Sequence, residues 1–418
     1  MTFGGATEYL CRLEKQSGIC PGTGRIKQLL RLLGDPQRRL RVVHVAGTNG
    51  KGSTARMIEA MLTAGGYCTG LFSSPAVTGV CDTVTVNGKP IFKRDFVRYI
   101  KRIRKVQKQM EQPASSFEVL TALALCCFAD QHTDICVIEC GMGGKNDATN
   151  VFKQPLCGVI TPIAMDHTAF LGNTLQQITE QKAGILKGSC AVVTAAQQPD
   201  EVLATLYRIA AERGLTVYMS PCAQEKGGVL CFGQERYTLQ LTGQMQLQNA
   251  CTALLVMQQL QDKGFAVDYR TKQRALESLH IPCRQEVMCR DPLVLLDGAH
   301  NPHNMQALVQ TMQTMETSKY TLVIGMLADK DTQQCCRLLA PLAETVICCN
   351  VPNARTLSAE QLAQQMRQAG AKTVLVQQNP RRALALAAKK FGQTPTVITG
   401  SFYLCAEIRD CLPRLYKM

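Results

Sequence analysis

Short apolar runs alternate with longer amphipathic stretches through the first half of the chain. The apolar runs suit buried strands, and the amphipathic stretches repeat their apolar positions with a helical period. The expected strands cover residues 41–46, 68–72, 134–139, 156–161 and 191–194. The expected helices between them cover residues 54–64, 117–129, 175–186 and 200–213. This alternation predicts a doubly wound, mostly parallel α/β sheet.

Two local features accompany this pattern. Helices are expected at 9–15 and 24–33, before the first strand, with a Pro21-Gly22 turn between them. Residues 83–91 are typical of a β-hairpin, because Asn87-Gly88 suits the left-handed positions of a tight turn. We expect this hairpin to form a lobe beside the sheet.

The strand and helix rhythm restarts after two further helices, at 246–263 and 272–279. The later strands are expected at 293–296, 320–325, 345–349, 373–376 and 396–399. A chain of 418 residues exceeds the usual size of a single core. We therefore expect an N-terminal domain of residues 1–281, a linker of residues 282–291, and a smaller, Rossmann-like α/β domain of residues 292–418.

The composition excludes several classes of protein. Hydrophobic residues make up 46% and charged residues 19%, which excludes a disordered chain. A net charge of +14 favours acidic partners, but the chain has no Trp and no basic–aromatic tract, so nucleic acid is not expected. The 21 cysteines form no zinc-like pair of CxxC units, no secretory leader is seen, and no apolar stretch could span a membrane. Reduced thiols in a cytoplasmic protein are expected.

A glycine-rich loop, Gly47-Thr48-Asn49-Gly50-Lys51-Gly52-Ser53, connects an expected strand to an expected helix. Its backbone N–H groups and the helix N-terminus can hold phosphate, while Lys51 neutralises negative charge. The loop departs from the common phosphate-loop motif, because two residues separate its first glycines and Gly52 stands where Ser or Thr usually follows the lysine. The loop predicts nucleotide binding, and a tight turn without a ligand is the alternative.

Three polar residues follow apolar strands at the edge of the sheet where ligands collect. Glu139 ends one strand and precedes the glycine-rich segment 141–144, so it is a candidate metal ligand. A solvated carboxylate is the alternative. His167 and His300 also follow apolar strands, and a purely structural histidine is the alternative for each.

Eight short motifs follow one another along the chain at suitable spacing. They are GTNGKGS at 47–53, SSP at 73–75, ECGMGG at 139–144, DATN at 147–150, DH at 166–167, KAG at 182–184, DGAHNP at 297–302 and TGS at 399–401. From about residue 8 to 410 the chain resembles the folylpolyglutamate synthase and dihydrofolate synthase family of the Mur ligase superfamily.

The resemblance implies a set of nucleotide and metal contacts. The implied ATP contacts are Gly47, Thr48, Asn49, Gly50, Lys51, Gly52, Ser53, Asn249, Arg284 and Asp297. The implied ligands of Mg²⁺, at two sites, are Ser74, Glu139, His167 and Lys182. Lys182 would carry a carbamate, which turns a cation into an anionic ligand. ATP would lie between the two domains, and a monovalent cation such as K⁺ is a further candidate cofactor.

The resemblance also implies where the other substrates bind. The implied folate contacts are Ser115, Ser116, Phe117, Glu118, Asn146, Asp147 and Ala148, and the implied glutamate contacts are His300 and Ser401. The turn at Pro21-Gly22 would close over the pterin. Phe117 could stack on the ring, and a place in the core is its alternative. The chain departs from the family pattern at Ala76, Ser116, Lys145 and Met245, mainly on the folate side, so the acceptor folate stays open.

The implied activity is that of an acid–amino-acid ligase acting on ATP, L-glutamate and either dihydropteroate or a reduced folate. ATP would phosphorylate a carboxylate of the acceptor, and the glutamate amine would then displace phosphate, with Lys51, Lys182 and His167 as the catalytic group. A monomer is expected. The first alternative is a Mur-type ligase that extends a peptidoglycan precursor, against which the folate segments and the two-domain organisation argue. The second is a nucleotide-switch or nucleic-acid-dependent NTPase.

Overall fold

Two compact units make up the described chain. The computed structural model describes residues 1–418 except 19, 227, 242, 316–318 and 417–418. The first unit comprises Met1–Gln240 and Gln246–Leu279, and the second comprises Leu241–Met245 and His280–Met418. The segment expected as a linker contains strand β12 (Glu286–Arg290), which pairs with β13 (Leu293–Leu296). A register shift between Val287 and Cys289 interrupts the alternation of this strand, which explains why its pattern was not recognised.

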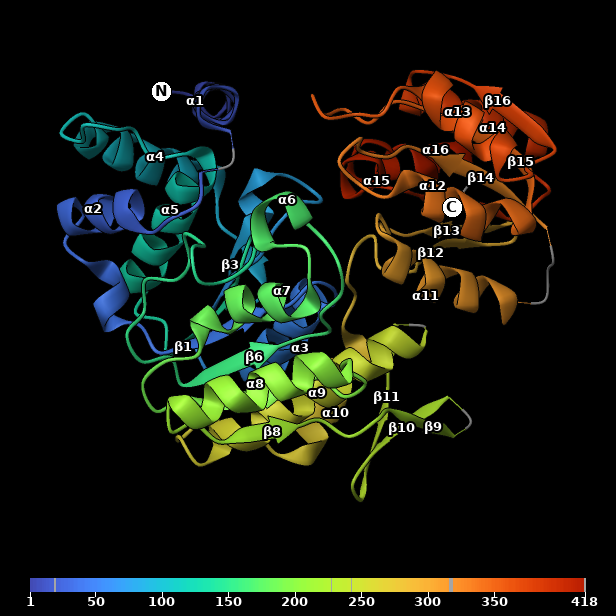
Figure 1. Ribbon diagram of the computed structural model, residues 1–418. Coiled ribbons are helices and arrows are strands. Elements are labelled where there is room, and N and C mark those ends of the chain that lie inside the picture. The colour runs from blue at the N-terminus through green and yellow to red at the C-terminus, as the bar shows by residue number, and fades with distance from the viewer. Residues whose placement is uncertain (19, 227, 242, 316–318, 417–418) are drawn as a thin grey trace. The chain divides into compact units, whose positions relative to one another are not determined.

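An eight-stranded sheet in the order β4-β3-β2-β5-β1-β6-β7-β8 forms the centre of the first unit (Figure 1). The run from β2 to β8 is parallel. β1 is buried along its whole length, as expected for a strand in a parallel sheet covered on both faces. The parallel strands are β1 (Val42–Ala46), β2 (Thr69–Phe72), β5 (Ile135–Glu139), β6 (Cys157–Ile160), β7 (Ala191–Thr194) and β8 (Val217–Met219).

The predicted hairpin forms, but it extends the sheet and is not a separate lobe. β3 (Val84–Val86) and β4 (Lys89–Pro90) are antiparallel, and β3 pairs with β2. The turn has the expected left-handed geometry, with φ of 51° at Asn87 and 72° at Gly88. Val84 is fully buried, so the hairpin gains more by covering the edge of the sheet than by standing alone.

Helices cover both faces of this sheet. Val42 and Ala46 of β1 point to one face, where the side chains of two helix groups meet the sheet in two core clusters. The first group is α1 (Phe3–Ser17), α2 (Gly24–Leu32), α4 (Lys93–Gln107) and α5 (Ser116–Asp130), and the second is α7 (Leu175–Lys182) and α8 (Asp200–Glu212). On the other face, α3 (Lys51–Ala64) packs on β1, β2 and β5 and contacts α10 (Tyr269–Ser278).

Several elements were not expected from the sequence. α4, β8 and a small antiparallel sheet of β9 (Gln224–Lys226), β10 (Val229–Phe232) and β11 (Glu235–Thr238) are among them. α3 begins at Lys51, three residues earlier than predicted. α9 (Gln244–Gln261), expected as amphipathic, is buried nearly all round, and its polar side chains at Gln248, Asn249 and Thr252 make hydrogen bonds.

The second unit is a smaller α/β domain, as predicted. Its six-stranded sheet has the order β12-β13-β17-β14-β15-β16 and is parallel except for β12. One core cluster joins α11 (Pro302–Gln313), α12 (Thr332–Leu339) and α13 (Ala359–Gln368) to the sheet, while α14 (Pro380–Phe391) and α15 (Phe402–Arg409) also pack on its strands. The remaining strands are β14 (Tyr320–Ile324), β15 (Ala343–Cys348), β16 (Thr373–Val376) and β17 (Thr396–Thr399). Together the two units confirm the predicted fold class.

The thiols and helices add two observations. All 21 cysteines are free, and most are buried; burial raises the pKa of Cys136, for example, to about 12, which keeps that thiol protonated. Among the described helices, none combines the length and the apolar character that a bilayer crossing requires.

Candidate active site

The glycine loop bends sharply between β1 and α3. Gly47 has φ of 154° and Gly50 has φ of 80°, a left-handed conformation that favours glycine. A Cβ at Gly47 would collide with the Thr161 side chain, and a Cβ at Gly50 would collide with Asn249 Oδ1. Both glycines are therefore required by backbone geometry and by close packing, and Asn249 of α9 lies directly against the loop.

The loop is fixed on one side and leaves hydrogen-bond donors on the other. The amides of Thr48 and Asn49 donate to the Pro162 carbonyl at 2.9 and 3.1 Å, and the Thr48 hydroxyl donates to the Ala164 carbonyl at 3.0 Å. The four amides from Gly50 to Ser53 belong to the first turn of α3, where no preceding helical carbonyl can accept them. Lys51 Nζ donates to the Thr48 carbonyl at 3.1 Å. This geometry suits an anion at the start of α3.

A carboxylate lies beside the same helix start. Glu139, the last residue of β5, is 4% exposed, and its Oε2 accepts a hydrogen bond from the Ser74 amide at 3.2 Å. A Cβ at Gly52 would lie 3.2 Å from that oxygen, so glycine is what allows the carboxylate to approach α3. The buried Ser53 hydroxyl has no hydrogen-bond partner among the described residues. Carboxylate and hydroxyl oxygens beside a phosphate site are the donors that Mg²⁺ prefers, so this set fits the ion.

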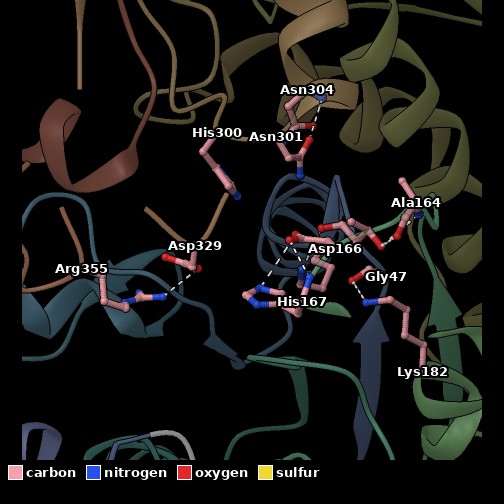
Figure 2. A network of polar contacts seen from close by, with 12 residues as sticks. Gly47, Ala164, Asp166, His167, Lys182, His300, Asn301, Asn304, Asp329 and Arg355 are labelled. Atoms are coloured by element: carbon pink, nitrogen blue, oxygen red, sulfur yellow. Dashed lines mark hydrogen bonds and ion pairs between the residues drawn. The ribbon is translucent and has the colours of Figure 1, made fainter. Parts of the chain in front are cut away.

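Lys182, at the end of α7, is buried beneath the loop. Lys182 is only 3% exposed, and its Nζ donates a hydrogen bond to the Gly47 carbonyl at 2.7 Å (Figure 2). Burial, and secondly the positive charge of Lys51, lowers the pKa of Lys182 to about 7. An amine with this pKa is substantially neutral at physiological pH, which is the state in which an amine is nucleophilic.

We expect this pKa to make stability depend on pH. Between about 7 and the ordinary value of 10.5, the folded chain binds fewer protons at Lys182 than the unfolded chain, so the free energy of unfolding rises with pH across that window. Lys182→Met should flatten the rise. Urea unfolding of both proteins at pH 7 and pH 9, in buffer free of metal and CO₂, measures the difference. Lys89→Met, at an exposed lysine, is the control, and an equal slope in wild type and Lys182→Met would contradict the assignment.

His167 and Asp166 form a pair at the start of the short helix α6 (Thr168–Leu171). His167 has φ of 50°, and its amide donates to Asp166 Oδ1 at 2.9 Å. Its Nε2 lies 3.8 Å from Asp166 Oδ2, as Figure 2 shows. The adjacent carboxylate can orient the imidazole. The sequence prediction of His167 did not include this partner.

The segment expected to contact folate builds the start of α5. Ser115 caps the helix, with its hydroxyl accepting from the Glu118 amide at 3.3 Å, while Glu118 Oε2 accepts from the Ser115 amide at 2.7 Å. This capping box satisfies two helix-start donors. Glu118 also pairs with Arg25 Nε of α2 at 3.1 Å. The Ser-x-x-Glu spacing was the signal for this cap, but neither the cap nor the pairing of Glu118 with Arg25 was predicted.

Phe117 is half-buried against the core of the first unit. Its ring centroid lies 5.7 Å from that of Phe72, with the two planes tilted by 39°. A Cβ at Gly141 would meet Phe117 Cζ at 2.5 Å, so the ring lies directly against the glycine-rich turn after β5. Phe117 thus joins the core while one part of it stays accessible, and Ser116 beside it is also half-exposed. Both interpretations of Phe117 remain compatible with this position.

Asp147 organises the loop after β5. Its buried carboxylate accepts from the Met142 amide at 2.8 Å and from the Thr149 amide at 2.9 Å and hydroxyl at 2.5 Å. Burial raises its pKa. Thr149 in turn contacts His44 Nε2 at 2.9 Å, and burial lowers the pKa of His44 to about 3, which keeps that histidine neutral. The Asp147 carboxylate thus holds the loop after β5 in place.

The two neighbours of Asp147 have different surroundings. The Asn146 carbonyl accepts from the Gly22 amide at 2.9 Å, which ties the expected Pro21-Gly22 turn to the loop after β5. Ala148 is 7% exposed and belongs to the core. The structure therefore brings the turn and the two expected folate segments to one region of the first unit, through Gly22, Phe117 and Gly141.

The second unit holds the remaining predicted residues. Arg284 lies over the Phe402 ring at 4.2 Å, and the Asp297 carboxylate accepts from the amides of Gln285 at 2.8 Å and Ala299 at 2.7 Å. The ring of His300 contacts Phe402, and its Nδ1 lies 2.8 Å from the Gly298 carbonyl. Ser401 caps α15 through the Tyr403 amide at 3.2 Å. Asp297 and Ser401 are buried and support backbone turns after β13 and β17.

Within the described part of the chain, no three His, Cys, Asp or Glu side chains gather as a ready metal site. The expected ligand set differs from such a cluster, because it combines a single carboxylate with a serine, a histidine and a modified lysine. Substrate phosphates commonly complete a Mg²⁺ site of this kind.

Comparisons with known proteins agree with this geometry. The family model of the Mur ligase middle domain matches residues 45–257, and that of the Mur ligase, glutamate ligase domain matches residues 283–402. The dihydrofolate synthase/folylpolyglutamate synthase of Bacillus subtilis is 32% identical over 94% of this chain and 96% of that protein.

Solved structures give the same result. The Mycobacterium tuberculosis folylpolyglutamate synthase complexed with ADP has a TM-score of 0.88 at 31% identity, over 98% of both chains. The Escherichia coli FolC protein in complex with DHPP and ADP has a TM-score of 0.87 at 27% identity, again over 98% of both chains. The chain therefore belongs to the folylpolyglutamate synthase and dihydrofolate synthase family of the Mur ligases.

Proposed function

We propose that this enzyme uses ATP to join L-glutamate to a folate through an amide bond, releasing ADP and phosphate. The observation that carries the proposal is the start of α3, where four first-turn amides, Lys51 and the Glu139 carboxylate meet. The names of the relatives support the same activity, since they are folylpolyglutamate and dihydrofolate synthases and two were solved with ADP.

The phosphate groups of ATP would bind at the glycine loop. The amides from Gly50 to Ser53 would donate to them, and Lys51 would leave the Thr48 carbonyl to neutralise charge that shifts as the terminal phosphoryl group transfers. Mg²⁺, held by Glu139, Ser74 and His167, would supply further neutralisation of the phosphate oxygens. Asn249, which touches Gly50, is positioned to sense or orient the nucleotide bound there. Arg284 and Asp297 are the proposed ATP contacts of the second unit.

The acceptor carboxylate would attack the terminal phosphorus, forming an acyl phosphate and ADP. The neutral amine of glutamate would then attack the acyl carbon. Phosphate would leave with the electron pair of the broken C–O bond and take up the proton that the nitrogen loses. Exclusion of water from the acyl phosphate protects it from hydrolysis. We propose His300 and Ser401 as glutamate contacts, and the region around Phe117 and the loop at 146–148 as the site of the pterin.

We also propose that Lys182 is a carbamate in the working enzyme. Its lowered pKa supports this, because only the neutral amine can attack CO₂, forming an N–C bond and releasing one proton. The product would be anionic beside the expected metal site, whereas a protonated lysine would repel the metal. Native mass spectrometry with and without bicarbonate would detect the added mass of CO₂, and its loss in Lys182→Met would locate it.

One assay tests the central proposal. Purified enzyme, in the presence of Mg²⁺ and K⁺, is given ATP, glutamate and either dihydropteroate or a tetrahydrofolate; ADP release and product mass are measured together. We expect glutamate-dependent ADP release and a product heavier by one glutamyl residue with at least one acceptor. No mass gain with either acceptor would contradict the proposal, and omission of K⁺ shows whether a monovalent ion is needed. We further propose a cytoplasmic monomer, which size-exclusion chromatography and cell fractionation would check.

A further inference from the structure

Helix α4 carries a straight stripe of positive charge. Its members follow one another at intervals of four, three, four and three residues, and all five are exposed; they are Arg94, Arg98, Lys101, Lys105 and Lys108. Lys108 is the C-cap of the helix. This spacing places the side chains on one face, opposite the face on which Phe96, Ile100 and Ile103 are buried. We call this set the α4 stripe.

The stripe belongs to an unusually basic part of the chain. Residues 1–110 hold 19 of the Lys and Arg residues and 6 of the Asp and Glu residues, so 13 of the 14 net positive charges lie in this quarter of the sequence. Asp95 pairs with Arg98 at 3.2 Å and with Arg94 at 3.8 Å. The lysines of the stripe have no ion pair among the described residues. Like charges three and four residues apart weaken a helix, so the stripe is unfavourable until an anion binds it.

The surroundings of the stripe narrow the class of anion. Lys101, Lys105 and Lys108, with Arg104 and Met1, line a shallow depression of about 320 Å³. The apolar face of α4 is buried in the core, so the helix has no apolar face left to insert into a lipid surface. A platform for successive bases needs several exposed rings. Tyr9 and Tyr99 are buried, and the exposed ring of Phe92, at the N-cap of α4, is already contacted by Arg94 at 5.1 Å. A narrow, flexible chain with regularly spaced carboxylates fits these conditions.

The stripe leads toward the proposed folate region. α4 contacts α5, and Arg102 pairs with Asp130, the last residue of α5, at 3.6 Å. A short connection, residues 108–115, joins the end of α4 to the beginning of α5. Lys108 therefore lies at the end of α4 from which the chain returns to Ser115 and Phe117. The stripe and the region around Phe117 belong to the same unit and the same core cluster.

We propose that the α4 stripe holds the oligoglutamate tail of long-chain acceptors. This inference rests on the proposed function. Each turnover would add glutamate at the reacting end, which must stay at the phosphate loop, so the earlier glutamate residues must bind elsewhere on the first unit as the tail grows. Neighbouring cations of the stripe are about 4.5 to 6 Å apart along the helix axis. An extended glutamate chain linked through its side-chain carboxylates repeats at roughly 6 Å, with one free carboxylate per residue.

The test compares two acceptors in wild type and in K101Q/K105Q/K108Q. One acceptor is a reduced folate with a single glutamate, and the other has five. An exposed ion pair contributes about twofold in an equilibrium constant, so the triple variant should raise KM for the five-glutamate acceptor by about tenfold. KM for the single-glutamate acceptor and both kcat values should stay unchanged. High salt should reduce the difference between the proteins, because it screens exposed charges.

A matched control is K372Q/K389Q/K390Q, three exposed lysines of the second unit, which should leave both KM values unchanged. An unchanged ratio of the two KM values in K101Q/K105Q/K108Q would overturn the proposal, as would equal loss for both acceptors. If wild type binds RNA or anionic vesicles more tightly than K101Q/K105Q/K108Q does, and the ratio of the two KM values is the same in both proteins, the stripe binds that partner and the proposal is wrong. If wild type uses neither acceptor, the proposed function fails by itself, and calorimetric titration with free pentaglutamate still decides whether the stripe binds it.

Discussion

Lys51→Ala is expected to lower kcat by about a hundredfold to a thousandfold with ATP at saturation. Lys51 is the only side-chain cation of the glycine loop, and a cation that stabilises transferring phosphoryl charge typically contributes on this scale. Its present contact with the Thr48 carbonyl is weak enough to exchange for a phosphate oxygen, since it is a single hydrogen bond of 3.1 Å. Steady-state ADP release with glutamate and the better acceptor measures the effect.

The control for this variant is Lys89→Ala, which removes an exposed lysine from the hairpin at the edge of the sheet. It should behave like wild type. Thermal unfolding of both variants shows whether the loop still folds, because Lys51 is half-buried and makes one backbone contact. Near-normal turnover of folded Lys51→Ala at saturating ATP would rule out the proposed role of the loop.

Glu139→Gln is expected to reduce kcat by at least about a hundredfold and to raise the Mg²⁺ concentration needed for half-maximal activity. The amide oxygen can still accept from the Ser74 amide, so the fold is preserved while the negative charge is lost. A neutral oxygen is a much weaker ligand for Mg²⁺ than a carboxylate. The measurement is a Mg²⁺ titration of ADP release at fixed ATP, with free metal calculated at each point.

Glu59→Gln is a closely matched control, because Glu59 is 5% exposed, against 4% for Glu139, and also accepts a backbone hydrogen bond, from the Gly88 amide at 2.5 Å. It lies under the hairpin and outside the proposed site. Its Mg²⁺ dependence should match that of wild type even if its stability changes. The metal assignment of Glu139 is lost if both variants show the same Mg²⁺ dependence as wild type.

Local features of the site were predictable because they depend on a few neighbouring residues. Asn87-Gly88 indicates a left-handed turn, which the backbone angles confirm. Lys51 was found because it lies in the glycine loop between an apolar strand and a helix, and Glu139 because it ends an apolar strand. The regular spacing of the basic residues on α4 is also visible in the sequence, but the helix itself was not predicted.

Contacts between distant parts of the chain were not predictable in this way. Arg25 and Glu118 are 93 residues apart, and Lys182 and Gly47 are 135 apart, so no local pattern pairs them. The same limit explains why the position of the hairpin was predicted wrongly. Its turn depends on neighbouring residues and was predicted correctly, whereas its place at the sheet edge depends on pairing with β2. Ser115 and Glu118, assigned to folate by resemblance, also form a helix cap that depends on local geometry.

By itself, the sequence determined the alternation of strands and helices, the glycine loop and the family. Periodicity and glycine-rich turns are properties of neighbouring residues, and the order of the short motifs can be followed along the chain without knowing which of them meet in space. Only the tertiary structure decided which groups are buried together. Burial beneath the loop changes Lys182 from an ordinary lysine into an amine with a pKa of about 7, and the missing side chain of Gly52 lets Glu139 approach α3. Both effects arise from desolvation and close approach, which depend on parts of the chain that are far apart in sequence.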